Sequence, residues 1–305
     1  MDSIEKLAQG LYKENNSIIV YKNGIGYLVN KKKDEKINVR SISKTILALA
    51  CGIVIGQYND FDEDTYIYPI IKNKISLKNK KNERYLKQIK VKHLLTHTVG
   101  YRDILLMSED INKFNIDNLL NEVINYPIYY RPGTHFLYSN ASYYILSATL
   151  QEFIGTDLFK FIDENLFDPL NIKNAKADKY GAYLAGATKF YLSTDNLLNI
   201  GKLLLNNGKF EGRQIISQAW IEKMKNPLFK NDFEIKKNYL SEDYYGYSLW
   251  ISKNGITFAS GTGGQLIVLM EKSNTIIVTT NNESSNKDYK IKSDIDNIIE
   301  ILNRG

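Results

Sequence analysis

The feature that most constrains this chain is an apolar segment directly after a serine and a lysine three residues apart. Ser41 and Lys44 precede a run from Thr45 to Val54 whose one polar residue is Thr45. This run predicts a helix held in a core, and residues three apart share a face of that helix. The helix dipole favours an alkoxide-like oxygen at Ser41. A lysine whose pKa is lowered by burial and neighbours is able to act on the serine proton.

The spacing alone is weak evidence, because it occurs three times. The other two pairs are Ser3 with Lys6 and Ser284 with Lys287. Only the middle pair opens an apolar helix, so context favours Ser41 and Lys44. The competing interpretation is a helix cap followed by a surface lysine.

The order of periodic segments predicts an α+β fold: an antiparallel sheet flanked by helices, with an inserted all-helical region. Expected strands cover 17–21, 25–29, 247–251, 256–260, 265–270 and 276–280, with Asn23-Gly24 as a hairpin turn. Expected helices cover 116–124, 141–153, 158–166, 195–206 (capped by Thr194), a segment from Ser217 to Lys225, and a closing helix capped by Ser293. We expect one domain over 1–305, made of an α/β part (1–58 plus 186–305) and a helical region (59–185).

Composition excludes some function classes. The chain has 305 residues, a net charge of +6 and one cysteine, Cys51. The charge is too modest to indicate nucleic-acid binding, and Cys51 is expected to be a reduced, buried thiol. The basic stretch from Lys72 to Lys92 is either a solvated face or a rim that attracts anions. No secretory signal or membrane-spanning run is visible, which favours a cytoplasmic protein. The sequence does not indicate an oligomeric state.

Several ordered segments resemble the serine β-lactamase-like superfamily. The Ser-x-x-Lys element is typical of penicillin-recognising serine enzymes. The similar segments are QIKVKHLLTHTVG (88–100), RPGTHFLYSN (131–140), FDPLNI (167–172) and NGKFEGRQIIS (207–217). The resemblance covers nearly the whole chain and is strongest to the class C branch, whose relatives include family VIII esterases, D-amino-acid peptidases and amide hydrolases. It implies the β-lactamase/transpeptidase-like fold.

The resemblance also implies a second catalytic motif, Tyr138-Ser139-Asn140. Tyr138 would take or relay the Ser41 proton and later activate the hydrolytic water, with its pKa tuned by Lys44. Asn140 would hydrogen-bond Lys44 and the substrate carbonyl. The alternative is a buried structural tyrosine. The same Tyr-x-Asn spacing at Tyr21 lies inside the first hairpin.

The third motif departs from the family pattern. The family places Lys-Thr-Gly or His-x-Gly on a strand that lines the site, and the corresponding stretch here is SGTGGQ (260–265). We align Thr262 with the Lys/His position, Gly264 with the final glycine and Gln265 with the next residue; a shift by one residue remains open. The amides of Ser41 and Gln265 would form the oxyanion hole. Because Thr262 carries no charge, a carboxylate anchor typical of β-lactamases is missing.

These observations predict a serine hydrolase that cleaves an ester or amide through an acyl-enzyme on Ser41. The substrate would be a small molecule or peptide-like, with no metal or organic cofactor. His93 and His97 lack the glutamate of a zinc helix. The alternatives are β-lactamase or D-Ala/D-amino-acid peptidase activity, and a catalytically inactive binding protein with the same fold.

Overall fold

An eight-stranded antiparallel sheet joins the two ends of the chain. The computed structural model describes residues 16–30, 35–107, 109–232, 239–282 and 288–304, so the pairs Ser3/Lys6 and Ser284/Lys287 lie outside the described residues. The sheet order is β10-β11-β12-β13-β14-β15-β1-β2, in which Ile19 of β1 lies opposite Val278 of β15. Its strands are β1 (Asn16–Lys22), β2 (Ile25–Asn30), β10 (Phe229–Lys230), β11 (Tyr244–Tyr245), β12 (Trp250–Ile251), β13 (Thr257–Gly261), β14 (Gln265–Met270) and β15 (Thr275–Asn281).

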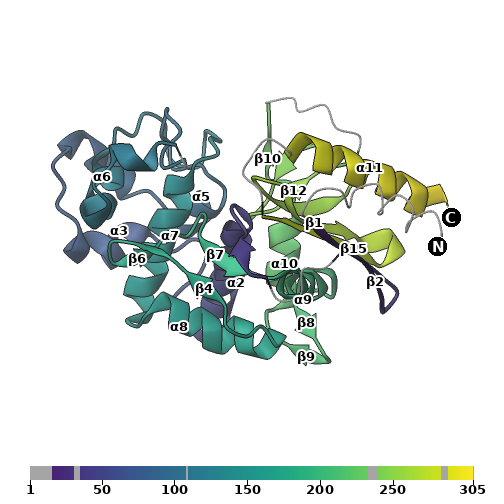
Figure 1. Cartoon of the computed structure of the whole chain (residues 1–305). Coiled ribbons are helices and arrows are strands. Elements are labelled where there is room, and N and C mark those ends of the chain that lie inside the picture. The colour runs from purple at the N-terminus through teal and green to yellow at the C-terminus, as the bar shows by residue number, and fades with distance from the viewer. Residues whose placement is uncertain (1–15, 31–34, 108, 233–238, 283–287, 305) are drawn as a thin grey trace.

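Helices cover both faces of this sheet (Figure 1). Along β14, Ile267 faces the core that contains α2 (Ile42–Gln57), α9 (Thr194–Leu205) and α10 (Gln218–Lys225). The next residue, Val268, faces α11 (Asp288–Arg304) on the opposite side. Successive strand residues point to opposite faces, and here both faces are apolar because both are covered.

The helical region packs around α7 beside α2 (Figure 1). Its helices are α3 (Ile67–Ile71), α4 (Glu83–Leu86), α5 (Val91–Leu95), α6 (Leu119–Asn125), α7 (Asn140–Ile154) and α8 (Leu158–Ile162), which continues into a π turn (Asp163–Phe167). Two- and three-residue strands complete the fold: β3 (Ile37–Asn38), β4 (Lys176–Ala177), β5 (Lys179–Tyr180), β6 (Tyr183–Leu184), β7 (Phe190–Leu192), β8 (Lys209–Phe210) and β9 (Arg213–Gln214). The predicted fold class is confirmed. The division at residues 58/59 and 185/186 stays a prediction.

Three predicted element boundaries are wrong. The cap of α9 is Ser193, whose Oγ accepts a hydrogen bond from the Asn196 amide at 3.3 Å. Ser293 lies inside α11, which already includes Asp288. The expected strand at 247–251 is reduced to β12, because Ser248 has a left-handed φ of 68° that interrupts an extended segment.

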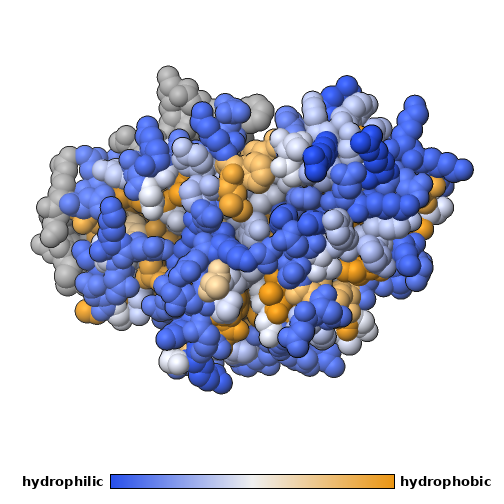
Figure 2. Space-filling model, turned by 180° about the vertical axis from the view of Figure 1, so that it is seen from behind, coloured by the Kyte–Doolittle hydropathy of each residue, from blue (hydrophilic) through white to orange (hydrophobic). Residues whose placement is uncertain are grey.

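The surface is mixed in character. Seen from behind, hydrophobic residues form separate spots among hydrophilic ones (Figure 2). Among the described helices, none is both long enough and apolar enough to cross a bilayer.

Candidate active site

The start of α2 brings Ser41 and Lys44 together as predicted from their spacing. The helix begins directly after the link between β3 and β7, where the Val39 amide donates to the Phe190 carbonyl at 2.9 Å. Lys44 Nζ lies 2.9 Å from Ser41 Oγ. Ser41 is half-buried, whereas Lys44 is 1 % exposed.

Lys44 is held by neutral partners. Its Nζ donates to Asn140 Oδ1 at 2.8 Å and to the Ala187 carbonyl at 3.3 Å. Asn140 opens α7, and its Nδ2 donates to the Leu106 carbonyl at 2.8 Å, which points Oδ1 towards Lys44. Burial lowers the pKa of Lys44 well below its ordinary value. The site therefore favours a neutral amine beside the serine hydroxyl.

Tyr138 completes a Ser-Lys-Tyr cluster. Its ring centroid lies 4.7 Å from Lys44 Nζ, and its hydroxyl interacts with Ser41. Burial raises the pKa of Tyr138, and the interaction with Ser41 only partly offsets this effect. Tyr138 is therefore a phenol at neutral pH, able to pass a proton on but poorly suited to remove one as a tyrosinate.

The predicted third-motif residues lie around the turn between β13 and β14. Thr262 is exposed in this turn, and Gly264 faces α11, where a Cβ would meet Ile291 Cδ1 at 2.2 Å. The Gln265 side chain is buried and donates to the Asn281 carbonyl at 2.8 Å.

Gly261 is the residue of this hairpin that abuts the approach to Ser41. A Cβ there would lie 2.4 Å from the Val39 carbonyl and 3.1 Å from Arg40 Cβ. The pairing of β12 with β13 covers Phe258 and Thr257. Residues 259–261 extend past that pairing, towards the start of α2.

His93 and His97 each accept a hydrogen bond from a different backbone amide. His93 Nδ1 accepts a hydrogen bond from the Lys90 amide at 3.1 Å, and His97 Nδ1 accepts one from the Ser139 amide at 3.2 Å. Within the described parts of the chain, no group of three or more histidine, cysteine or acidic side chains is arranged to hold a metal ion.

Sequence reasoning missed several contributors to the site. Ala187 and Leu106 contribute through their backbone carbonyls, so their residue types do not indicate this role. The sequence indicates no partner for His97, although the centroid of its ring lies 4.4 Å from that of the Tyr138 ring. The signal available was the resemblance of its segment to the family.

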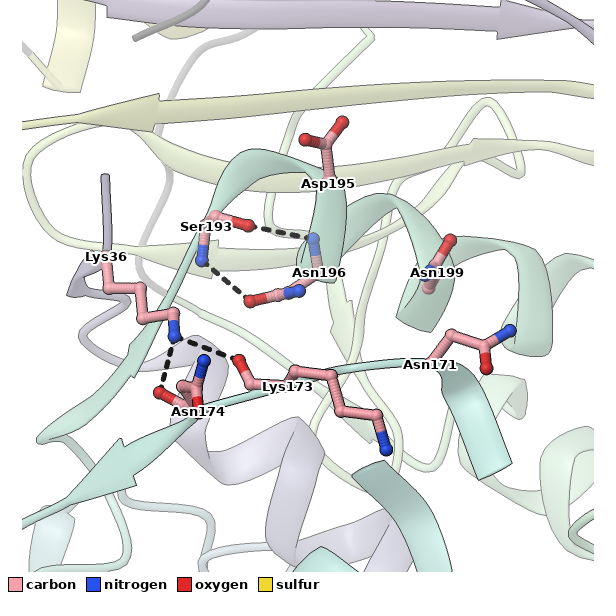
Figure 3. Close-up of a pocket in the computed structure, with 8 residues that line it drawn as sticks. All are labelled: Lys36, Asn171, Lys173, Asn174, Ser193, Asp195, Asn196 and Asn199. Carbon is pink, nitrogen blue, oxygen red and sulfur yellow. Dashed lines mark hydrogen bonds between the residues drawn. The ribbon is translucent and has the colours of Figure 1, made fainter. Parts of the chain in front are cut away.

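A polar cavity of about 420 Å³ lies elsewhere, between the segment after α8 and the start of α9 (Figure 3). Lys36 reaches across it and donates to the carbonyls of Lys173 and Asn174 at 2.9 and 2.6 Å. None of the residues that line it is a predicted catalytic residue.

Comparisons with known proteins identify the family of this chain and support its fold. The model of the family described as beta-lactamase matches residues 15–299. A Bacteroides dorei protein, assigned only provisionally as a beta-lactamase, superposes with a TM-score of 0.78 at 17% identity, covering 99% of this chain and 98% of that one. The octameric penicillin-binding protein homologue from Pyrococcus abyssi has a TM-score of 0.72 at 18% identity, covering 98% and 76%. EstCE1, a hydrolase with promiscuous acyltransferase activity, has a TM-score of 0.74 at 15% identity, covering 97% of each chain.

Proposed function

Because the chain belongs to the beta-lactamase family, a family of serine hydrolases, we propose that it cleaves an ester or amide through an acyl-enzyme on Ser41. The observation that carries this proposal is the contact of Ser41 Oγ with the buried amine of Lys44 at 2.9 Å. An amine with a lowered pKa is a suitable general base for a serine hydroxyl.

In the proposed acylation, Ser41 Oγ bonds to the substrate carbonyl carbon while its proton passes to Lys44. Tyr138, which lies beside Lys44 and interacts with Ser41, donates its proton to the leaving group and is reprotonated from Lys44. The carbon–leaving-group bond then breaks. In deacylation, water attacks the acyl carbon and gives one proton back through the same groups, which restores Ser41. Asn140 holds Lys44 in place throughout.

We infer a different register for the third motif. The close approach of Gly261 to Arg40 supports Ala259, Ser260 and Gly261 as the strand segment beside the nucleophile. In this register Ala259 takes the Lys/His position, and the backbone after Gly261 supplies the second oxyanion amide with that of Ser41. The alternative of Thr262, Gly264 and Gln265 requires exposed Thr262 to anchor the substrate. Both registers leave this position without a cation.

The lack of that cation favours an uncharged ester or amide over a β-lactam antibiotic. β-Lactamase or D-amino-acid peptidase activity is the second candidate, motivated by the family match and the Ser41, Lys44 and Tyr138 cluster. Hydrolysis of nitrocefin at a rate comparable to that of a p-nitrophenyl ester would reverse this order. A non-catalytic binding role would be favoured if no acyl-enzyme forms with any ester, amide or β-lactam.

The test of the nucleophile is Ser41→Ala. We expect loss of fluorophosphonate labelling and of the p-nitrophenol burst, with an unchanged fold by circular dichroism. Ser43→Ala is the matched control, because Ser43 is a buried serine on the same helix whose Oγ accepts a hydrogen bond from the Phe190 amide. Labelling that persists in Ser41→Ala, measured by intact mass, would overturn the assignment.

A further inference from the structure

His97 makes three contacts with the segment that carries Tyr138. Its carbonyl accepts the Leu137 amide at 3.0 Å, and its Nδ1 accepts the Ser139 amide at 3.2 Å. Its ring packs against the Tyr138 ring, with centroids 4.4 Å apart. The residues on both sides of Tyr138 are therefore fixed by one residue, Leu137 by the His97 backbone carbonyl and Ser139 by the His97 side chain, which is 1 % exposed.

The hydrogen bonds around His97 also define its tautomer. Since Nδ1 accepts from a backbone amide, the ring proton lies on Nε2, which then donates to the Tyr245 hydroxyl at 3.2 Å. The Tyr245 hydroxyl interacts with Tyr143, and Tyr143 donates to the Leu95 carbonyl at 2.9 Å. The two ring nitrogens of His97 therefore have opposite roles, with Nδ1 as the acceptor and Nε2 as the donor.

We propose that His97 is a positioning residue for Tyr138, held as a neutral imidazole with its proton on Nε2. This inference rests on the proposed role of Tyr138 in the serine hydrolase. An imidazolium would lose the acceptor for the Ser139 amide and so release one side of the Tyr138 segment. A small displacement of the phenol away from Ser41 and Lys44 is sufficient to slow proton transfer strongly.

The groups that face the His97 ring favour its neutral form. They are the amine of Lys44 and the phenols of Tyr138, Tyr143 and Tyr245. Burial lowers the pKa of His97 well below its usual value. The hydrogen bond from the Ser139 amide to His97 Nδ1 is therefore expected to persist when the medium is mildly acidic.

The tautomer is testable without any activity measurement. Nitrogen-15 NMR of the full chain, with the His97 signals identified by their loss in His97→Asn, reports the state of each ring nitrogen. We expect Nε2 to carry the proton and Nδ1 to be unprotonated from about pH 7 down to about pH 5.5. A proton on Nδ1, or an imidazolium at neutral pH, would overturn the inference while leaving the role of Ser41 intact.

Variants of His97 test the positioning itself. In His97→Asn, Oδ1 takes the place of Nδ1, and asparagine tolerates the left-handed φ of 55° found here. His97→Leu has no acceptor. Per Ser41 titrated by fluorophosphonate, we expect kcat to fall about a hundredfold in His97→Leu, with KM little changed, and to stay within about tenfold in His97→Asn.

His135→Leu is the matched control, because His135 is exposed and stacks on Tyr130 at 4.2 Å. It should retain the parental kcat. Normalisation to titrated Ser41 removes the effect of misfolded protein, and the NMR result stands even if His97→Leu fails to fold. A parental kcat per titrated serine in His97→Leu would refute the positioning role. Labelling of Ser41→Ala would instead refute the proposed function.

Discussion

Lys44 is the residue on which the proposed chemistry of the site depends. Its hydrogen-bond partners Ser41, Asn140 and Ala187 are all neutral, so they solvate an ammonium without compensating its charge. Desolvation then favours the amine. A neutral lysine next to a serine hydroxyl is a base, whereas a charged one is only a donor.

This reasoning predicts the pH dependence of acylation. Because the pKa of Lys44 is lowered, its amine is deprotonated above that value, and the acylation rate should rise with pH through it and then level off. Lys44→Arg keeps a donor that does not lose its proton in proteins, so we expect at least about a hundredfold loss and no such rise. The measurement is the burst rate with a p-nitrophenyl ester from about pH 5 to about pH 10.

Lys44→Met is the companion variant, since it has similar length and no proton. Both variants should fail equally if Lys44 acts as a base. An arginine variant that acylates at the parental rate would show that Lys44 acts only through its charge or hydrogen bonds.

The residues of the cluster were predictable from motif order, but their protonation was not. The spacing placed Ser41 beside Lys44, and family resemblance added Tyr138 and Asn140. The resemblance implies that Tyr138 takes or relays the Ser41 proton with a pKa tuned by Lys44. Burial raises the pKa of Tyr138, which favours the relay. Desolvation depends on what packs around a side chain from distant parts of the chain, which residue spacing does not reveal.

At the scale of elements, α2 is anchored by a close contact with α10. The indole of Trp220 lies directly over Gly52, where a Cβ would be 2.2 Å from Trp220 Cδ1. Its Nε1 also donates to the Ala48 carbonyl at 2.9 Å. The helix that carries Ser41 and Lys44 is therefore held in place by the contact of its Gly52 with the Trp220 indole.

Two glycine-to-alanine changes on α2 should therefore have opposite effects. Gly52→Ala forces the indole away and should cost about 1–3 kcal/mol of unfolding free energy. Gly56→Ala has nothing within 4 Å of the new Cβ and should stabilise the chain by up to about 1 kcal/mol through helix propensity. Urea unfolding of both variants provides the comparison. Equal effects would mean that α10 moves freely to accept a methyl group.

The hairpin of β13 and β14 gives a second element-scale prediction. In Gly261→Val the new Cβ would meet the Val39 carbonyl at 2.4 Å, so β13 must move away from the start of α2. We expect the labelling rate of Ser41 to fall about a hundredfold, because the oxyanion donor moves with the strand. Thr262→Val distinguishes the two registers: a comparable loss there would restore Thr262 as the substrate anchor.

Long periodic elements were predicted well, and very short ones were not. The strands that became β1, β14 and β15 were predicted to within about one residue, which matches the usual uncertainty of element ends. In contrast, β10 and β11 have two residues each, too few for any alternating pattern. The third-motif register was ambiguous for a related reason, since a run of glycines fits several alignments equally well.

For the whole molecule, the decisive arrangement is that β1 lies inside the sheet. It pairs with β15 on one side and β2 on the other, so the first described strand connects the C-terminal meander to the N-terminal hairpin. That the two parts would meet followed from their shared strand character. The pairing partner of β1 and the position of α11 over the sheet did not follow, because contacts between distant segments leave no local trace in the sequence.

This arrangement predicts that a small change in β1 weakens the entire fold. Val20 is fully buried beneath α11, so Val20→Thr buries a hydroxyl and should cost about 1–3 kcal/mol. Ile25, on neighbouring β2, is 58% exposed, and the unfolding free energy of Ile25→Thr should stay within about 0.5 kcal/mol of the parental value.

Urea unfolding should be followed by far-UV circular dichroism, which reports mainly the helices, and by fluorescence of Trp220 and Trp250. If the sheet and the helical region unfold as one unit, the two probes give the same lowered midpoint in Val20→Thr. A lowered midpoint in fluorescence alone would show that the helical region is stable without the sheet.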